Sequence, residues 1–248
     1  ISILIHLIVN PHLRSGIVSM NEIVKGKVKT VHSTDDPDQV LIEYHDKVTA
    51  GNGKKVSYPE GKGAVCCAIS ELFFKYIERK AGFLTHFIDR PSPNTMLCKK
   101  LTIIPVEVIV RNIAAGSIVR NTLLPEGMEF DPPLVEFNLK DDEKDDPLLT
   151  SDRVSLMGYD PVILARRASQ LNCHFKKVFG EIGLTVVDFK FECGHASDGG
   201  LYLADEISPD SFRLWKDGKS YDKDLFRKDK GDIVEAYTKI LSDLQGVI

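Results

Sequence analysis

The sequence predicts an α+β fold in which the sheets are largely antiparallel. Short apolar runs typical of strands follow one another with few helices between them, which argues against a doubly wound parallel sheet. Three longer segments repeat apolar residues every three or four positions, as amphipathic helices do. The chain has 248 residues, of which 43% are hydrophobic, so it can bury a sizeable core. A change in composition near residues 80–95 predicts a small N-terminal lobe (20–90) and a larger C-terminal lobe (91–248).

The elements expected in the first hundred residues are mostly strands. The exception is a helix, in which Val65, Ile69, Phe73 and Tyr76 keep a helical spacing and Gly82 suits the C-terminal stop. In chain order we expect a strand or hairpin at 24–33, a strand at 40–46 and a glycine-rich loop at 47–55. This helix follows at 62–81, and two short strands follow at 83–89 and 95–101.

The rest of the chain contains the clearest helical pattern. Leu171, Phe175, Val178 and Ile182 lie on one stripe, which predicts a helix. In chain order we expect a strand at 105–112 and, at 129–147, a loop that holds one strand and ends in a run of carboxylates. This helix follows at 160–182, then two strands around a turn at 184–194 and 201–207, and an amphipathic helix at 231–245.

Composition excludes several classes of protein. The net charge of −4 and the pI of about 6.0 lack the basic excess of a nucleic-acid-binding protein. The five cysteines are odd in number and form no CxxC pair, as expected for reduced thiols in a cytoplasmic protein. The apolar run over residues 1–9 is too short to span a bilayer and lacks the flanks of a signal peptide. We expect no membrane association, and we treat residues 1–19 as an extension of unknown role.

Three charged residues alternate along the strand predicted over residues 184–194. Asp188, Lys190 and Glu192 share one face, because successive side chains of a strand point to opposite sides. If the next strand pairs antiparallel with Lys190 opposite Asp205, Asp205 lies on the same face as Glu192. Two carboxylates beside a lysine fit a Mg²⁺ site that is completed by substrate phosphates. A solvated face with cross-strand ion pairs explains the pattern at least as well.

Two other stretches carry groups that bind anions. In "KGKVKTV", Lys27 and Lys29 share a strand face beside Gly26, which suits a phosphate but also a lysine-protected edge strand. In "IVRNIAAGS", Arg111 precedes a small-residue turn that ends in Ser117, which suits a carboxylate or phosphate but also an ordinary surface arginine.

The segment "SPDSFRLW" places Asp210 and Arg213 in what is expected to be a turn. A plain salt-bridged turn accounts for it as well as a binding site does. The acidic run "KDDEKDDP" is expected to be a solvated loop.

Six segments taken together resemble one family. In chain order they are "KGKVKTV", "TAGNGKK", "KKLTIIPVEVIVRNIAAGS", "PPLVEFNLKDDEKDDP", "VVDFKFECG" and "LADEISPDSFRLW". They are similar to the signature segments of SAICAR synthetases, and the likeness runs from about Ile23 to the C-terminus. The resemblance implies a stand-alone enzyme of the bacterial type.

The family resemblance implies a two-lobed SAICAR-synthase-like fold, with a small β-rich, kinase-like N-terminal lobe and a larger α+β lobe. It also implies an ATP-dependent ligase of purine biosynthesis, which joins L-aspartate to the carboxylate of CAIR (carboxyaminoimidazole ribonucleotide) through an acyl phosphate. ATP, Mg²⁺, CAIR and L-aspartate are the expected ligands, and a homodimer is the expected assembly. A kinase-like phosphotransferase on a small molecule and a non-catalytic nucleotide-binding regulator are the alternatives.

The resemblance also assigns roles to residues. Lys190, Asp188 and Asp210 would lie at the reacting centre, and Glu192 and Asp205 would bind Mg²⁺. The expected nucleotide-binding residues are Lys27, Lys29, Lys99, Leu101, Ile103 and Glu107. The expected substrate-binding residues are Arg111, Ser117, Arg213, Lys140, Asp146 and Asp46.

Three positions depart from the pattern of similar sequences. Asn52 stands where Asp is frequent, Ile113 where Arg or Tyr is frequent, and Phe212 where a small residue is usual. The departure at Asn52 weakens a charge-based role for the loop that contains it. The other two are expected to be packing changes, although Phe212 is close enough to shift Arg213.

Overall fold

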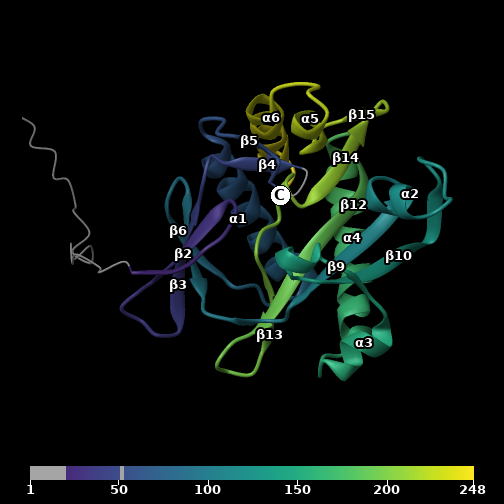
Figure 1. Ribbon diagram of the computed structural model, residues 1–248. Coiled ribbons are helices and arrows are strands. Elements are labelled where there is room, and N and C mark those ends of the chain that lie inside the picture. Colours follow the sequence, from purple (N-terminus) through teal and green to yellow (C-terminus); the bar gives the residue numbers. More distant parts are fainter. Residues whose placement is uncertain (1–20, 51–52) are drawn as a thin grey trace, which may run out of the picture.

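Two antiparallel sheets stand side by side in the computed structural model, which describes residues 21–50 and 53–248 (Figure 1). The expected extension over residues 1–19 and the departure at Asn52 lie outside the described residues. The mixture of antiparallel sheets and helices is the α+β architecture that the sequence predicts.

The first sheet is built from the N-terminal strands. Its order is β1-β2-β3-β7-β6, with bounds Glu22–Lys25, Lys29–Ser33, Gln39–Tyr44, Thr95–Lys99 and Phe87–Ser92. Strands β1 and β2 form the hairpin expected over residues 24–33, with Val24 opposite Val31. Because β7 belongs to this sheet, the sheet extends past the division expected at residue 90.

A separate hairpin lies where the sequence predicted a glycine-rich loop. Strands β4 (Val48–Ala50) and β5 (Lys55–Ser57) pair antiparallel, with Thr49 opposite Val56. The loop prediction was therefore wrong for these residues. Strands of three residues are too short to show a clear alternation.

The second sheet is organised around its longest central strand, β12 (Thr185–His195). The N-terminal part of β12 pairs with β9 and β14, and its C-terminal part pairs with β8 and β13. The other strands of this sheet are β8 (Thr102–Ile103), β9 (Val106–Ile113), β10 (Glu129–Leu139), β11 (Leu148–Leu149), β13 (Leu201–Ala204), β14 (Phe212–Lys216) and β15 (Lys219–Ser220).

The three long helices occur where the sequence predicts them. They are α1 (Lys62–Ala81), α4 (Pro161–Glu181) and α6 (Ile233–Gln245). Gly82 ends α1 in a left-handed conformation, and the Asp160 carboxylate caps the N-terminus of α4. The sequence did not predict the short helices α2 (Ser117–Asn121), α3 (Ser151–Leu156), η1 (Asp142–Lys144) and α5 (Asp224–Arg227).

An aromatic cluster fills the space between helices α1 and α4 and the second sheet. The ring of Phe175 lies 4.9 Å from that of Phe189, 5.0 Å from that of Phe212 and 5.4 Å from that of Phe73, in edge-to-face contacts. Phe212 is buried, so the departure at this position is a core packing change. It is the first residue of β14, which corrects the expectation that Arg213 lies in a turn.

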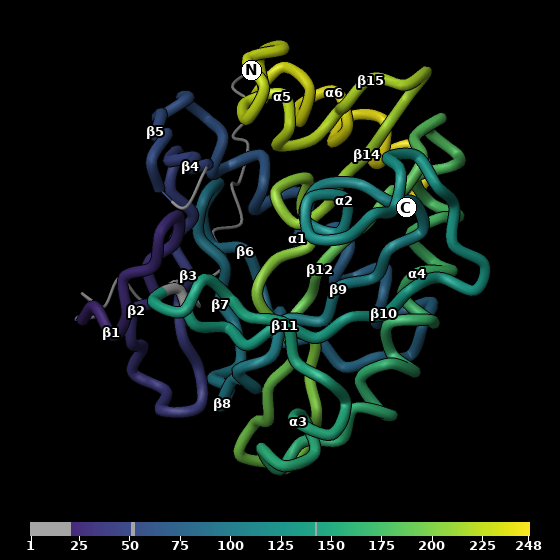
Figure 2. Tube along the Cα trace, turned by 45° about the vertical axis from the view of Figure 1, so that its right-hand side comes forward, coloured from purple at the N-terminus to yellow at the C-terminus, as the bar shows by residue number. Residues whose placement is uncertain are grey.

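The two sheets are joined by backbone hydrogen bonds at β13. The amide of His86 donates to the carbonyl of Leu203 at 2.9 Å, and the amide of Leu203 donates to the carbonyl of Leu84 at 2.9 Å. The Cα trace in Figure 2 shows β1, β2 and β3 on the left and α4 and β10 on the right, with β12 between them. Charged side chains from both sheets therefore meet here.

No helix within the described ranges is both long enough and apolar enough to cross a bilayer.

The aromatic cluster yields a stability prediction. Phe175→Ala should lower the free energy of unfolding by about 3–5 kcal/mol, because a fully buried ring leaves a cavity. Urea denaturation followed by circular dichroism measures the change. Leu123→Ala is the matched control, because Leu123 is fully exposed, and it should change stability by less than about 0.5 kcal/mol. Equal effects from the two substitutions would contradict the assigned core.

Candidate active site

The register at the end of β13 differs from the one expected. Glu192 pairs with Ala204, and Lys190 lies opposite Ile109 of β9 rather than opposite Asp205. The expected pairing was wrong by one residue, and β13 ends before Asp205. Asp205 has a left-handed backbone with φ of 63°. Strand alternation therefore ends before Asp205 and does not turn its side chain away from Glu192.

Each of these two carboxylates has a lysine partner. Lys29, from β2 of the first sheet, forms an ion pair with Asp205 and lies 3.5 Å from a carboxylate oxygen of Glu206. Lys140, which follows β10, forms an ion pair with Glu192. Glu206, for which the sequence suggested no role, also accepts a hydrogen bond from the Ser208 hydroxyl at 2.9 Å.

The surroundings of the two carboxylates shift their pKa values in opposite directions. Burial and the nearby Asp205 carboxylate raise the pKa of Glu192 to about 7, against the opposing effect of Lys140. Burial also acts to raise the pKa of Asp205, but Lys29 and Lys140 outweigh it and hold that pKa below its usual value. Their interaction indicates that the two carboxylates lie close together.

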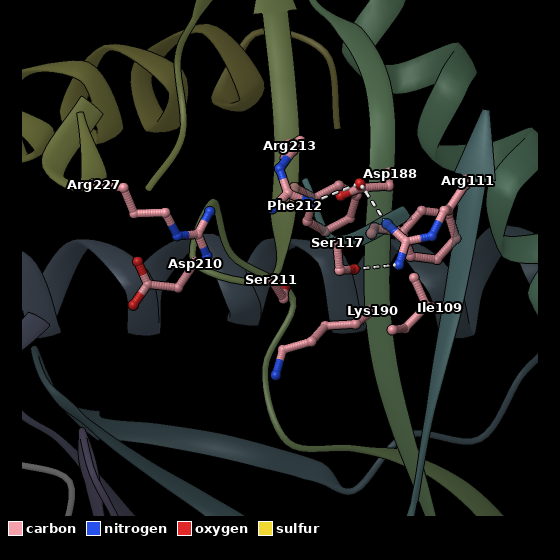
Figure 3. Close-up of a pocket in the computed structure, with 11 residues that line it drawn as sticks. Ile109, Arg111, Ser117, Asp188, Lys190, Asp210, Ser211, Phe212, Arg213 and Arg227 are labelled. Carbon is pink, nitrogen blue, oxygen red and sulfur yellow. Dashed lines mark hydrogen bonds and ion pairs between the residues drawn. The ribbon is translucent and has the colours of Figure 1, made fainter. Parts of the chain in front are cut away.

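A cavity of about 190 Å³ opens between β9, β12 and β14 (Figure 3). Two arginines meet one carboxylate at its wall. Nη1 of Arg213 lies 2.7 Å from Oδ2 of Asp188, and Nη1 of Arg111 lies 3.3 Å from the same oxygen. Arg111 also donates to the Ser117 hydroxyl at 2.9 Å. Each arginine also has a second acidic neighbour: Nε of Arg111 pairs with Glu136 at 2.5 Å, and Nε of Arg213 lies 3.8 Å from Asp224.

Gly116 permits a close approach to Arg213. A Cβ atom at this position would lie 2.4 Å from Nη2 of Arg213, and the backbone φ is 67°. The backbone conformation favours glycine at this turn, and a side chain here would displace the end of the Arg213 side chain.

Lys190 lines the same cavity from β12. Its ammonium group pairs with Glu107 of β9 at 2.5 Å. Burial acts to lower the pKa of Lys190, but Glu107 outweighs it and raises that pKa. The family resemblance assigns Glu107 to the nucleotide and Lys190 to the reacting centre, and the structure brings the two into contact.

Asp210 is held by side chains that the sequence did not predict. It forms a buried ion pair with Lys62 of α1, accepts a hydrogen bond from the Tyr237 hydroxyl at 2.8 Å, and lies 4.0 Å from Nζ of Lys223. Nothing in the local sequence marks these three residues, because a lysine at a helix start and a tyrosine in an amphipathic helix are common. Lys62 and Asp210 are separated by 148 residues.

The remaining sequence candidates lie away from the cavity or are engaged locally. Lys99 lies 3.6 Å from Asp198 in the turn between β12 and β13, and its ammonium group lies 5.3 Å from the centre of the Tyr202 ring. Lys27 lies between β1 and β2, and Leu101 and Ile103 lie at or next to β8.

Two carboxylates expected to bind substrate accept hydrogen bonds from backbone amides instead. Asp46 accepts hydrogen bonds from the amides of Gly61 and Gly63, at 2.9 and 2.8 Å, at the start of α1. Asp146 accepts a hydrogen bond from the amide of Asp141 at 2.9 Å. The structure therefore does not bring Asp46 and Asp146 into the cavity wall.

A family model described as SAICAR synthetase matches residues 22–244 of the chain. This range contains Glu192, Asp205, Asp210 and the cavity. The chain belongs to the SAICAR synthetase family. It is an ATP-dependent ligase of purine biosynthesis.

Several relatives named phosphoribosylaminoimidazole-succinocarboxamide synthase are similar to this SAICAR synthetase over most of their length. The relative from Thermosynechococcus vestitus is 45% identical over 88% of this chain and 93% of its own. The relative from Persephonella marina is 45% identical over 90% of this chain and 96% of its own.

Solved SAICAR synthetase structures share the fold. A type-2 structure in complex with ADP has a TM-score of 0.85 at 38% identity and covers 90% of this chain and 97% of its own. The enzyme from Ehrlichia chaffeensis has a TM-score of 0.85 at 34% identity and covers 92% of this chain and 100% of its own. These likenesses confirm the predicted α+β fold of a SAICAR synthetase.

The ion pair between Lys62 and Asp210 yields a prediction about this SAICAR synthetase. Lys62→Met should lower the free energy of unfolding by about 3–5 kcal/mol, because it leaves the Asp210 carboxylate buried without its closest cation. Adding Asp210→Asn should recover part of that loss, with a coupling energy of about 1–3 kcal/mol in a double-mutant cycle. Additive effects in urea denaturation would show that the two groups do not interact.

Proposed function

We propose that the enzyme phosphorylates the carboxylate of CAIR with ATP and joins the resulting acyl phosphate to the amine of L-aspartate, releasing SAICAR, ADP and phosphate. Membership of the SAICAR synthetase family supports this reaction. The observation that carries the assignment of roles is the alternation along β12. Asp188, Lys190 and Glu192 share one face there, and each contacts a different charged group. At about 3.3 Å per residue they span about 13 Å, which suits a substrate that carries anions at two ends.

The N-terminal lobe expected over residues 20–90 would cover ATP, and residues 91–248 would hold CAIR and Mg²⁺. Lys29 supports this division, because it reaches from β2 to the carboxylates after β13. A SAICAR synthetase of similar fold is described in complex with ADP. We assign Lys27 and Lys29 to the phosphates, and Lys99, Leu101 and Ile103 to the segment that holds adenine. Glu107 contacts Lys190, so we place it beside the reacting centre instead.

Glu192 and Asp205 would hold Mg²⁺. Their chemistry fits, because both supply carboxylate oxygens, and burial together with the neighbouring Asp205 carboxylate raises the pKa of Glu192. No group of three or more metal-ligating side chains occurs among residues 21–50 and 53–248. Substrate phosphates would supply the other ligands of a cation held by two carboxylates. The ion would neutralise charge on the phosphates during transfer.

Arg111, Ser117 and Arg213 would grip an anion of CAIR. The two guanidinium groups converge on Asp188 at the cavity wall, and the Ser117 hydroxyl contacts Arg111. Lys190 would steady the CAIR carboxylate as it is phosphorylated, since it remains charged beside Glu107. Asp188 positions the arginines, and Asp210 lines the same cavity.

L-Aspartate is the third substrate. Lys140 approaches Glu192 and would contact an anion at the metal end. Asp46 would act by holding the start of α1, and Asp146 by holding its own loop, because both accept backbone hydrogen bonds.

We also propose a cytoplasmic homodimer. Leu148, Leu156 and Val162 are 59%, 87% and 64% exposed, and they lie on the adjoining elements β11, α3 and α4. Exposed apolar side chains on adjoining elements favour association with a partner.

The ligase reaction makes a direct prediction. Steady ADP release should require CAIR and L-aspartate together, and mass spectrometry should detect SAICAR in an amount equal to the ADP. A coupled ADP assay with each substrate omitted in turn provides the measurement. Full turnover without aspartate would favour the kinase-like phosphotransferase, and ATP binding without any turnover would favour the regulator.

The proposed metal ligands make a second prediction. Asp205→Asn should lower kcat by at least about 100-fold, because the metal loses half of its protein charge. It should also abolish the tightening of ATP binding by Mg²⁺, measured by titration calorimetry. Asp152→Asn on α3 is the control and should behave as the wild type, since Asp152 is exposed. Wild-type turnover of Asp205→Asn in excess Mg²⁺ would exclude the metal assignment.

A further inference from the structure

One ammonium group faces two consecutive carboxylates at the junction of the two sheets. Lys29 forms an ion pair with Asp205, and its Nζ lies 3.5 Å from Oε1 of Glu206. Successive side chains of a regular strand point to opposite sides. The left-handed backbone of Asp205 breaks that alternation, so Asp205 and Glu206 both turn toward Lys29. The roles proposed for Lys29 and Asp205 leave Glu206 without one.

The two carboxylates differ in how open they are to solvent. The Asp205 side chain is 27% exposed, whereas the Glu206 side chain is 8% exposed. Asp205 is therefore the more accessible of the two to a ligand that arrives from solvent. Lys29, at 14% exposed, contacts one carboxylate that a ligand can reach and one that is largely sealed.

Glu206 is fixed by the turn that follows it. Its Oε2 accepts a hydrogen bond from the Ser208 hydroxyl at 2.9 Å, and its carbonyl accepts one from the Ser211 hydroxyl at 3.4 Å. The Ser208 hydroxyl also accepts a hydrogen bond from the amide of Asp210 at 3.2 Å, which ties the turn to the cavity wall. Each oxygen of the Glu206 carboxylate thus has its own neighbour, Ser208 for Oε2 and Lys29 for Oε1.

Cation binding at Asp205 would deprive Lys29 of its closest partner. When Asp205 supplies an oxygen to Mg²⁺, the ammonium group of Lys29 is left beside a divalent cation. A largely buried ammonium group is costly unless an anion stays within reach. Glu206 already faces the same nitrogen, so Lys29 can change partners by a small movement across the 3.5 Å that separates Nζ from Oε1.

We propose that Glu206 is a positioning residue that holds Lys29 beside the ATP phosphates when Asp205 turns to the cation. The inference rests on the proposed function, in which Asp205 binds Mg²⁺ and Lys29 contacts the phosphates. In that state Glu206 offsets the charge of Lys29, which reduces the repulsion between the ammonium group and the cation. Without the Glu206 carboxylate, Lys29 would remain on Asp205 and compete with the cation for it. The exchange of partners makes no covalent bond and moves no proton.

Binding of Mn²⁺ to the enzyme saturated with ADP provides the test. Mn²⁺ takes the same oxygen ligands as Mg²⁺, and electron paramagnetic resonance measures the free ion. Glu206→Gln keeps the shape of the side chain and an oxygen for the Ser208 hydroxyl but removes the charge. It should weaken Mn²⁺ binding by about 10-fold, the size expected for one neighbouring charge.

Turnover should show the same dependence on the cation. Glu206→Gln should raise the Mg²⁺ concentration that gives half of the maximal rate in the same proportion as it weakens Mn²⁺ binding. Its kcat at saturating Mg²⁺ should stay within about threefold of the wild type, because Glu206 touches no reacting atom. A general loss of structure would lower kcat instead, and circular dichroism checks that each variant is folded.

Two further variants separate positioning from charge alone. Glu206→Asp keeps the charge but is one methylene shorter, so it cannot reach both the Ser208 hydroxyl and Lys29. It should show most of the loss seen in Glu206→Gln, and it carries the test if that variant does not fold. Glu126→Gln removes an exposed carboxylate from the loop before β10 and should bind Mn²⁺ as the wild type does.

Wild-type Mn²⁺ affinity in Glu206→Gln would overturn the positioning role. So would wild-type affinity in Glu206→Asp, because any nearby negative charge would then suffice. A fall in kcat at saturating Mg²⁺ with unchanged Mn²⁺ affinity would equally contradict it. Asp205→Asn is measured in the same titration. If that variant binds Mn²⁺ as tightly as the wild type, the metal assignment of the proposed function fails, whatever the Glu206 variants show.

Discussion

The pairing of β12 on both edges is the constraint on which the rest of the structure depends. This strand is held by β9 on one edge and by β14 and then β13 on the other. A slip of one residue would turn its apolar residues out of the core and its charged residues into it, so the register is strongly specified. Because Phe189 and Phe191 are buried, Asp188, Lys190 and Glu192 are presented together on the opposite face.

Charge pairing across the two sheets then defines the site. Lys29 reaches from the first sheet to Asp205, and Lys62 reaches from α1 to Asp210. Ion pairs with this little exposure to water are costly to break, because each partner would be left as an isolated buried charge. The same contacts that join the two halves of the molecule therefore place the carboxylates and lysines of the proposed reaction, which links the stability of the interface to function.

The long elements could be predicted from the sequence, whereas short elements and registers could not. Periodicity located α1, α4 and α6, because each buries a stripe of several turns. It missed α5, which has only four residues, and it interpreted the β4–β5 hairpin as a loop. The pairing of β12 with β13 was misplaced by one residue, because the left-handed backbone at Asp205 ends the strand earlier than the apolar pattern suggests.

The sequence by itself determined which charged residues of β12 lie on one face, because alternation follows from the local geometry of a strand. It also determined the family, because six separate segments resemble one group of enzymes in the same order. Only the tertiary structure decided which residues surround Asp210, and it brought Lys62, Tyr237 and Lys223 there from three different elements. Contacts between residues this far apart depend on how whole helices and sheets pack, and no local pattern encodes them.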